Sequence, residues 1–373
     1  MRILVLGSGR PDRAADSLAE ILALRHEVTL FPFEQGFQPF PSRLYALNAP
    51  LRLGLKVIRK PASFFADRWL LRWLGGRRFD MVLTTAVTSH PPSLIRELRA
   101  RTGALVIGWF PDTIARMDGA EFTGAPFDRL FFKDKVITER LRSALATDRY
   151  DFLPQAFDPW IHRPVADRFA PPDAAVDVAI FGNSYAYRAE LMGPLLATRE
   201  IRTVVYGDPS YDCDPRLRAV YRPAVRGTAK SAAMRLASIA LNTNLYAELG
   251  GVNKRTFELA AMGAFQLTDA PRIAEYFEPG VECATFRGPH DLVDQVRHWL
   301  ALPAERAAIA RRGLVRAFRE HTYNHRLNEM FDRVPALRGE PKIPVPVGPP
   351  DPDGEIELAG GTPERRLTRV FSK

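Results

Sequence analysis

Residues Gly250–Gly280 read GGVNKRTFELAAMGAFQLTDAPRIAEYFEPG, an order of residue types that favours a helix with an anion at its start. Asn253 is a residue type that commonly caps a helix, so we expect a helix over residues 254–262. The free amides and the partial positive charge at a helix N-terminus attract phosphate. Lys254 and Arg255 add two full charges there, and an arginine can hold a diphosphate through two parallel hydrogen bonds.

Glu258 is the one carboxylate of this expected helix, and its neighbours in FELAAMG are apolar or small. One interpretation places Glu258 on the helix surface, paired with Arg255 three residues earlier. In the other, it accepts hydrogen bonds from both hydroxyls of a ribose, which contribute about 1.5–3 kcal/mol each for a charged acceptor. The glycine pair before the helix, which includes Gly251, allows the backbone to approach a ligand closely. This combination matches what a nucleoside diphosphate requires.

The chain has 373 residues, 46% of them hydrophobic and 25% charged, which is typical of a globular protein with more than one domain. Apolar strand-like runs alternate with helix-like runs, which predicts an α/β fold with parallel sheets covered by helices on both faces. The expected strands are residues 2–7, 26–33, 80–85, 104–112, 127–134, 176–184, 202–208 and 238–244.

Composition sets the expected domain boundaries. The two domains are residues 1–155 and 176–334, each with the alternation of strands and helices. Residues 156–175 are rich in proline and aromatic side chains and show neither period, so we expect an interdomain linker there. Residues 335–373 are rich in proline and glycine, which predicts a disordered tail.

The net charge is +9, and most of it falls in residues 51–79, where Asp67 is the sole acid among many lysines and arginines. Trp69 and Trp73 lie four residues apart in this basic stretch. It is either a helix that packs on the core with a solvated basic face, or an interfacial helix that contacts an anionic membrane. Nucleic acid is disfavoured as a partner because the stretch is too apolar. Without an apolar run of membrane-spanning length or a secretory signal, we expect a cytoplasmic protein, placed peripherally on the inner membrane face under the second interpretation.

The stretch GSGRPD at residues 7–12 follows the first expected strand and matches part of a dinucleotide fingerprint. Asp12 stands where the third glycine belongs, although Glu34 is a candidate ribose acid after the next strand. The glycines are also consistent with a plain tight turn, which we favour. We therefore expect no cofactor, and the seven histidines show no spacing typical of a metal site.

The segment that begins at residue 238 resembles the GT-B glycosyltransferases and, more narrowly, the family of the spore maturation protein CgeB. The resemblance is carried over residues 238–327 by SIALNTN, NKRTFELAAMGAFQLTD, YFEPGVE with TFRGPHDL, ALPAERAAIARRG and HTYNHRL. Upstream, AIFGNSYAYRAEL, WFPD and FLPQAFDPWIHRP fit more loosely. The resemblance implies two Rossmann-like domains that face each other across a cleft. The second would bind a nucleotide-sugar donor, the first an acceptor, and the last helix would cross back toward the first domain.

The donor-binding residues expected from the segment and the resemblance together are Gly251, Asn253, Lys254, Arg255, Glu258, Asn183, Ser184, Tyr206 and Gly207. Glu258 takes the position of the ribose-binding glutamate. Asn183 and Ser184 would line the phosphate site, and Tyr206 and Gly207 would lie near the base. The largest related group of retaining enzymes has a second glutamate eight residues before the ribose-binding one. Gly250 stands there in this chain, which leaves the stereochemical course open.

An inverting transfer needs a base that takes the proton of the acceptor hydroxyl. Asp112, at the end of an expected strand, and His90, before an expected helix, are the candidates; the alternatives are a turn residue and a helix-start residue. We expect a metal-independent glycosyltransferase that acts on a glycan or lipid-linked acceptor, as in polysaccharide biosynthesis. The alternatives are an inactive GT-B module that binds a nucleotide sugar or glycan in polysaccharide assembly, and a GT-B-type sugar-nucleotide epimerase.

Overall fold

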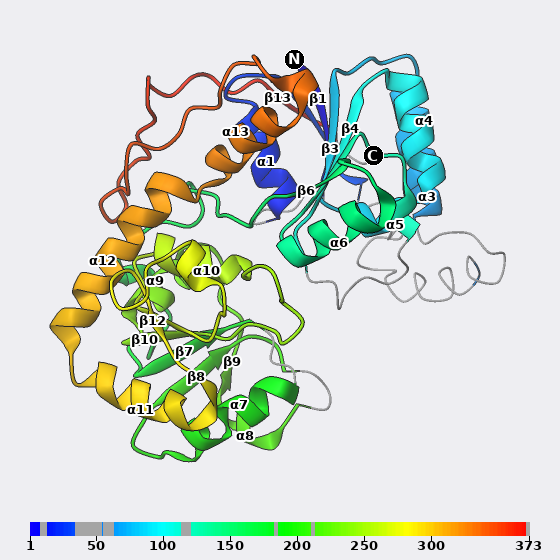
Figure 1. Cartoon of the computed structure of the whole chain (residues 1–373). Helices are drawn as coiled ribbons and strands as arrows, with labels where there is room; N and C mark the ends of the chain where they lie inside the picture. Colours follow the sequence, from blue (N-terminus) through cyan, green and yellow to red (C-terminus); the bar gives the residue numbers. More distant parts are fainter. Residues whose placement is uncertain are drawn as a thin grey trace. The chain divides into compact units, whose positions relative to one another are not determined.

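The computed structural model describes residues 1–7, 13–33, 54, 63–112, 121–182, 186–209 and 213–370. The chain divides into two compact units, each with its own parallel sheet (Figure 1). The first unit contains Met1–Pro154, Arg326–Pro344 and Thr362–Lys373, and the second contains Gln155–His325 and Val345–Gly361. The predicted α/β fold with two Rossmann-like sheets is confirmed.

The first sheet has the strand order β13-β2-β1-β3-β4-β5-β6, and every pair is parallel. Its strands are β1 (Arg2–Leu6), β2 (Glu27–Phe31), β3 (Met81–Thr84), β4 (Leu105–Phe110), β5 (Arg129–Phe132), β6 (Tyr150–Phe152) and β13 (Leu367–Arg369). The helices between them are α1 (Ala14–Leu22), α3 (Phe64–Leu74), α4 (Pro92–Thr102), α5 (Glu121–Gly124) and α6 (Lys135–Leu145), with a 3-10 turn η3 (Val87–Ser89). The sequence did not predict β6, because it has three residues and leads directly into the proline-rich connection.

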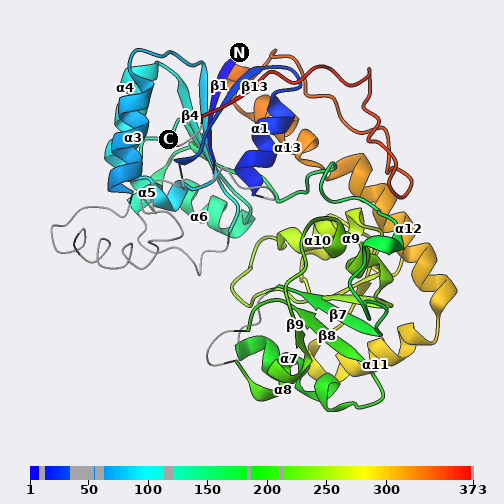
Figure 2. The ribbon, with the colours of Figure 1, turned by 180° about the vertical axis from the view of Figure 1, so that it is seen from behind.

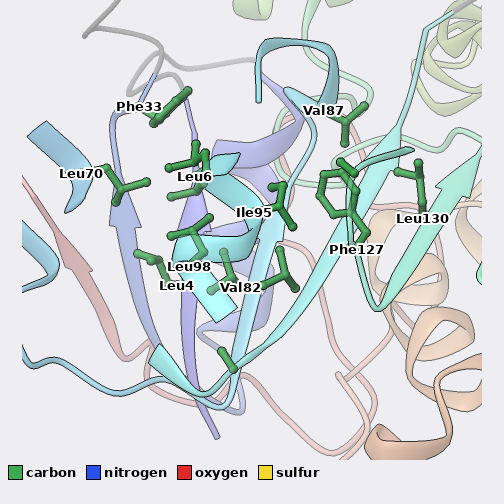
Figure 3. Packing of buried hydrophobic residues seen from close by; sticks show 14 of the residues in the cluster. Leu4, Leu6, Phe33, Leu70, Val82, Val87, Ile95, Leu98, Phe127 and Leu130 are labelled. Atoms are coloured by element: carbon green, nitrogen blue, oxygen red, sulfur yellow. The ribbon is translucent and has the colours of Figure 1, made fainter. Parts of the chain in front are cut away.

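Helices cover both faces of the first sheet, with α3 and α4 on one face and α1 on the other (Figures 1 and 2). Side chains alternate between the faces along each strand. Leu4 and Leu6 of β1 thus meet Leu70 of α3 and Leu98 of α4 in one buried cluster, which Figure 3 shows.

Helix α3 belongs to the predicted basic stretch, of which residues 51–53 and 55–62 lie outside the described residues. The rings of Trp69 and Trp73 pack on Phe31 of β2, with centroids 4.3 and 5.1 Å away. The arginines Arg68, Arg72 and Arg77 are at the more solvated positions of this segment. This geometry favours the core-packing interpretation over membrane contact. No helix formed by the described residues is long and apolar enough to cross a membrane.

The C-terminal segment differs from the disordered tail that its composition predicts. Strand β13 pairs with β2 in parallel, Val28 donates a backbone hydrogen bond to Arg366, and Val370 donates one to Leu30. Arg365 and Arg369 both form ion pairs with Glu20 of α1. Without β13, β2 would be an edge strand with unpaired backbone groups, and the tail satisfies them. The prediction of disorder relied on proline content, whereas β13 forms because it pairs with β2, which is far away in the sequence.

The second sheet is also parallel and has the order β12-β11-β10-β7-β8-β9. Its strands are β7 (Val178–Phe181), β8 (Thr203–Tyr206), β9 (Tyr221–Arg222), β10 (Ile239–Asn242), β11 (Gln266–Thr268) and β12 (Ala284–Thr285). Its helices are α7 (Ala186–Ala197), α8 (Pro215–Val220), α9 (Gly227–Leu236), α10 (Lys254–Ala261), α11 (Gly288–Leu300), α12 (Pro303–Glu320) and α13 (Tyr323–Arg333). Helix α13 begins in the second unit and ends in the first. The remaining 3-10 turns are η5 (Asp167–Phe169), η6 (Ile273–Glu275) and η7 (Pro335–Leu337).

Alternate residues of β7 build two separate cores in the second unit. Val178 and Ile180 join a cluster with α7, α8 and α11, whereas Ala179 and Phe181 join one with α9 and α10. Figures 1 and 2 show these two groups of helices on opposite faces of the sheet. The strand order reverses between β7 and β10, and open α/β sheets bind ligands beyond the carboxyl ends of their strands at such a switch point.

Candidate functional site

Helix α10 begins just beyond the carboxyl end of β10 and is capped as the sequence predicts. Asn253 Oδ1 accepts a hydrogen bond from the Thr256 amide at 3.1 Å, which satisfies one free amide of the first turn. Asn253 Nδ2 donates to Asn242 Oδ1 at 3.0 Å and to Asn244 Oδ1 at 2.6 Å. The helix ends at Ala261, followed by Gly263 with φ +73°. The side chain of Asn253 therefore fixes the helix start, and its predicted contact with a donor stays a prediction.

A buried polar network attaches the start of α10 to the end of the sheet. Asn242, the last residue of β10, donates through Nδ2 to Thr256 Oγ1 and to Gln266 Oε1, both at 3.0 Å. Asn242 and Thr256 are completely buried, so these bonds are protected from water. The helix N-terminus is thus held at the carboxyl edge of the sheet, where its free amides meet an approaching ligand.

The guanidinium group of Arg255 lies against the end of β7. Gly182 follows β7 with φ +101°, and a Cβ built on it would lie 2.5 Å from Arg255 Nη2. A Cβ on Gly207, after β8, would lie 2.6 Å from the carbonyl oxygen of Gly182. Only glycine allows these approaches at both places. Arg255 therefore lies at the switch point between β7 and β10.

Glu258 is buried and binds three cationic or polar side chains. Its Oε2 lies 2.7 Å from Lys230 Nζ, and its Oε1 lies 3.0 Å from Lys254 Nζ and 3.2 Å from His162 Nε2. Burial alone would raise the pKa of Glu258, but Lys230, Lys254 and His162 outweigh it and hold that pKa well below its usual value. Glu258 is therefore ionised, and it is not the surface partner of Arg255 that one interpretation predicted. Its predicted ribose contact stays a prediction.

Several cationic side chains surround Glu258. Burial lowers the pKa of His162 although Glu258 opposes this, so the imidazole is neutral near pH 7. Burial lowers the pKa of Lys230, whereas the pKa of Lys254 is raised because Tyr323 and Glu258 outweigh its burial. Asp158 also acts on Lys254. Lys230 and Lys254 thus contact Glu258 directly, and Arg255 acts electrostatically on Lys230. This cluster suits an anionic ligand.

Sequence reasoning missed Lys230 and His162. Lys230 lies in the first turn of α9, and His162 lies in the connection after β6. One signal was available, because Lys230 and Lys254 are the only lysines in the sequence between Gln155 and His325. Two lysines in a stretch otherwise rich in arginine indicate positions where a lysine has a specific role.

The other predicted donor residues have mixed placements. Asn183 and Ser184 lie outside the described residues. Tyr206 is buried, and its ring stacks on Phe181 with centroids 5.3 Å apart and an interplanar angle of 15°, which gives it a packing role in the core. Gly207 packs on Gly182 at the carboxyl edge, and Gly251 is buried beside α10.

The two candidate bases lie after neighbouring strands of the first sheet. His90 is buried, its Nε2 is 2.7 Å from Thr84 Oγ1, and its ring packs edge-on against Phe33. Burial lowers the pKa of His90 to about 3, so it is a poor proton acceptor at neutral pH. Asp112 is exposed, two residues beyond β4. Among the residues with described positions, no group of three or more His, Cys, Asp or Glu is arranged to hold a metal ion.

Comparisons with known proteins agree with this architecture. Residues 188–332 match the family model described as glycosyl transferase-like. No curated protein matches the chain. A solved structure of Anabaena HepE in complex with UDP and glucose is similar over 89% of this chain and 98% of its own, with a TM-score of 0.59 and 11% identity. The structure of sucrose-phosphate synthase from Thermosynechococcus elongatus is similar over 89% of this chain and 98% of its own, with a TM-score of 0.59 and 12% identity.

A third similar structure is AviGT4, a glycosyltransferase involved in avilamycin A biosynthesis, with a TM-score of 0.56 and 16% identity over 90% of this chain and 98% of its own. These similarities show that the chain has the GT-B fold. Residues 188–332, which include β8, β10 and all of α10, are similar to a glycosyl transferase-like domain.

Proposed function

We propose that the protein is a glycosyltransferase whose second unit binds a nucleotide-sugar donor through its diphosphate. The observation that carries this proposal is the position of Arg255 against Gly182, at the switch point of the second sheet. Lys254 and the capped N-terminus of α10 add further positive charge at the same edge. The similarity of residues 188–332 to a glycosyl transferase-like domain supports the same conclusion.

The proposed chemistry depends on the leaving group. A sugar transfer releases a nucleoside diphosphate, whose negative charge grows as the glycosidic bond breaks. Arg255, Lys254 and the helix amides would stabilise that charge, which is the kind of electrostatic contribution that usually dominates catalysis. HepE was solved with UDP, so UDP is the first nucleotide to try.

We assign the acceptor to the first unit and the role of base to Asp112. Asp112 is exposed after β4, whereas His90 is buried and its pKa lies far below neutrality. Removal of a general base lowers turnover by about 100-fold or more. Asp112→Asn should therefore lower the rate of sugar transfer and leave UDP affinity unchanged; equal transfer rates for both proteins would rule out this role.

The acceptor class we propose is a glycan or lipid-linked saccharide, within the CgeB-like family that the sequence resembles. Contact of the basic stretch with a membrane gains no support from α3, because Trp69 and Trp73 pack on Phe31. Co-sedimentation with anionic vesicles at low and high salt tests that contact directly.

A thermal-shift panel of nucleotide sugars tests the donor proposal. A ligand that binds only the native state raises the free energy of unfolding by about 2.7 kcal/mol at 100 times its Kd. The melting temperature rises as a result. We expect UDP and at least one UDP-sugar to stabilise the protein more than UMP does, because the site holds the diphosphate. Equal shifts for UDP and UMP would contradict the proposal.

A binding module without turnover is the second candidate, and Gly250 is the observation that favours it. The glutamate found at that position in retaining relatives is absent from this sequence. Release of free nucleoside diphosphate in the presence of an acceptor separates the enzyme from the module. Conversion of the donor without any acceptor would instead identify an epimerase.

A further inference from the structure

Glu258 joins three segments that are distant in sequence. Its two oxygens meet Lys230 of α9, Lys254 of α10 and His162 of the connection after β6, at 2.7, 3.0 and 3.2 Å. Each oxygen thus has at least one donor. A ribose would have to share these oxygens with groups that hold them more strongly, since charged donors make the stronger hydrogen bonds.

The lysines lie nearer to solvent than the carboxylate does. The side chains of Lys230 and Lys254 are 23% and 26% exposed, and that of Glu258 is 7% exposed. A ligand that approaches from solvent therefore meets part of each lysine side chain before it meets the carboxylate. Both lysines lie in first turns of helices that follow parallel strands, so both are near the carboxyl edge of the second sheet.

The charged neighbours of Lys230 and Lys254 determine whether the two ammonium groups can lie side by side. Arg255 repels Lys230, and Lys254 repels it as well. Tyr323, whose ring centroid is 5.9 Å from Lys254 Nζ, and Asp158 act on Lys254. His162 is neutral and donates a hydrogen bond from Nε2 to the Glu258 carboxylate, without adding charge. Glu258 is thus the anion that both ammonium groups touch.

We propose that Glu258 is a positioning residue that holds Lys230 and Lys254 toward the donor diphosphate, and that Lys230 is a third cation of that site. This inference rests on the proposed function. Without the carboxylate, two adjacent ammonium groups repel each other, and each loses the charge that favours its protonated form. Loss of Glu258 should therefore weaken every diphosphate ligand, with or without a ribose.

Calorimetric titration with three ligands separates the two roles of Glu258. The ligands are UDP, 2′,3′-dideoxy-UDP and inorganic pyrophosphate, and the proteins are wild type, Glu258→Gln, Lys230→Gln and the control Glu200→Gln. Glu200 pairs with Arg297 on the surface of the same unit. We expect Glu258→Gln and Lys230→Gln to weaken all three ligands by a similar factor, about 10-fold or more for a lost charged contact. The control should bind like the wild type.

The opposite pattern would overturn the inference. If Glu258→Gln weakens UDP but leaves dideoxy-UDP and pyrophosphate unchanged, Glu258 contacts the ribose. If Lys230→Gln, which leaves Glu258 paired with Lys254, binds pyrophosphate like the wild type, Lys230 is not part of the site. If the wild type binds neither UDP nor pyrophosphate, the proposed function fails, and this inference fails with it.

The pH dependence of pyrophosphate affinity is a readout that a merely structural role would not move. The groups that face the lysines are Glu258, Asp158, His162, Tyr323 and Arg255. Removal of the anion lowers lysine pKa values. As the pH rises from 7 to 9, the lysines lose their protons and pyrophosphate affinity falls. In Glu258→Gln this fall should begin at a lower pH than in the wild type. Parallel profiles would contradict the proposal.

Discussion

Both sheets are parallel with their first strand in the interior, and they differ in the charge placed beside the first glycine turn. In both, the first strand lies between the second strand and a later one, so both have a switch point at the carboxyl edge. A Cβ built on Gly7, after β1, would lie 3.1 Å from Asp16 Oδ2, whereas one on Gly182, after β7, would lie 2.5 Å from Arg255 Nη2. We therefore expect the guanidinium to favour phosphate at the second turn and the carboxylate to disfavour it at the first.

The side chains at the end of the strand across each switch point, β3 in the first sheet and β10 in the second, also differ. In the first unit, His90 turns inward to Thr84 and Phe33 and contributes to packing. In the second unit, Asn242 and Asn253 use their hydrogen bonds to hold a helix whose first residues are cations. Both sheets thus provide a candidate site at the carboxyl edge, and the guanidinium beside Gly182 is the reason that we propose the second as the phosphate site.

The largest expected effect concerns the ion cluster of the second unit. Glu258→Ala leaves Lys230 and Lys254 without their shared anion, and breaking a buried pair costs about 3–5 kcal/mol of unfolding free energy. Urea denaturation measures this loss. The control Glu200→Ala removes an exposed ion pair with Arg297 and should change stability little. Similar losses in both variants would show that the cluster is not a buried network.

A smaller effect is expected at the two glycine turns. Gly182→Ala places a Cβ against Arg255 at φ +101°, which costs about 1–3 kcal/mol in strain and displaces the guanidinium. UDP affinity should fall with stability. Gly7→Ala meets Leu30 Cδ1 at 2.7 Å and should lower stability while the folded protein binds UDP as the wild type does. If both variants lose UDP affinity alike, the turns do not differ in function.

The effect expected to be smallest near neutral pH is the proton linkage of His90. Its pKa of about 3 lies below the unfolded value of 6.5, so the unfolded state binds the proton first as the pH falls. The neutral imidazole therefore stabilises the fold fully above pH 6.5, and this contribution declines toward pH 3 by about 1.4 kcal/mol per unit. His26 adds a decline of the same sign in every variant. The stability difference between wild type and His90→Asn should narrow from pH 6.5 to 4.5; a constant difference would show that His90 titrates normally.

The eight strands that the sequence predicts are all present, because they are largely buried apolar runs. Runs such as VAIF in β7 need no distant partner to be recognised. The short strands β6, β9, β11 and β12 and the tail strand β13 were not predicted, since two or three residues carry no periodic signal and β13 depends on the edge of β2. Nothing in a Pro/Gly-rich composition indicates such pairing.

The candidate site was only half visible in the sequence. Asn253 and Arg255 follow local rules for caps and helix starts, so their positions were predictable. The partners of Glu258 were not, because Lys230 and His162 approach it from 28 and 96 residues away (258 − 230 and 258 − 162). Helical spacing pointed to Arg255 as the partner of Glu258, whereas Lys254 at four residues has the contact. Packing decides which distant charges come into contact, and the local spacing of residues does not reveal it.

Calorimetric titration of UDP into the wild type and Arg255→Ala tests the central claim that the second sheet binds a diphosphate at its switch point. Loss of a charged hydrogen bond costs about 1.5–3 kcal/mol, so Arg255→Ala should weaken UDP about 10- to 100-fold. Arg297→Ala, at the exposed pair with Glu200, is the matched control and should bind UDP with unchanged affinity. Equal UDP affinity in the wild type and Arg255→Ala would contradict the claim.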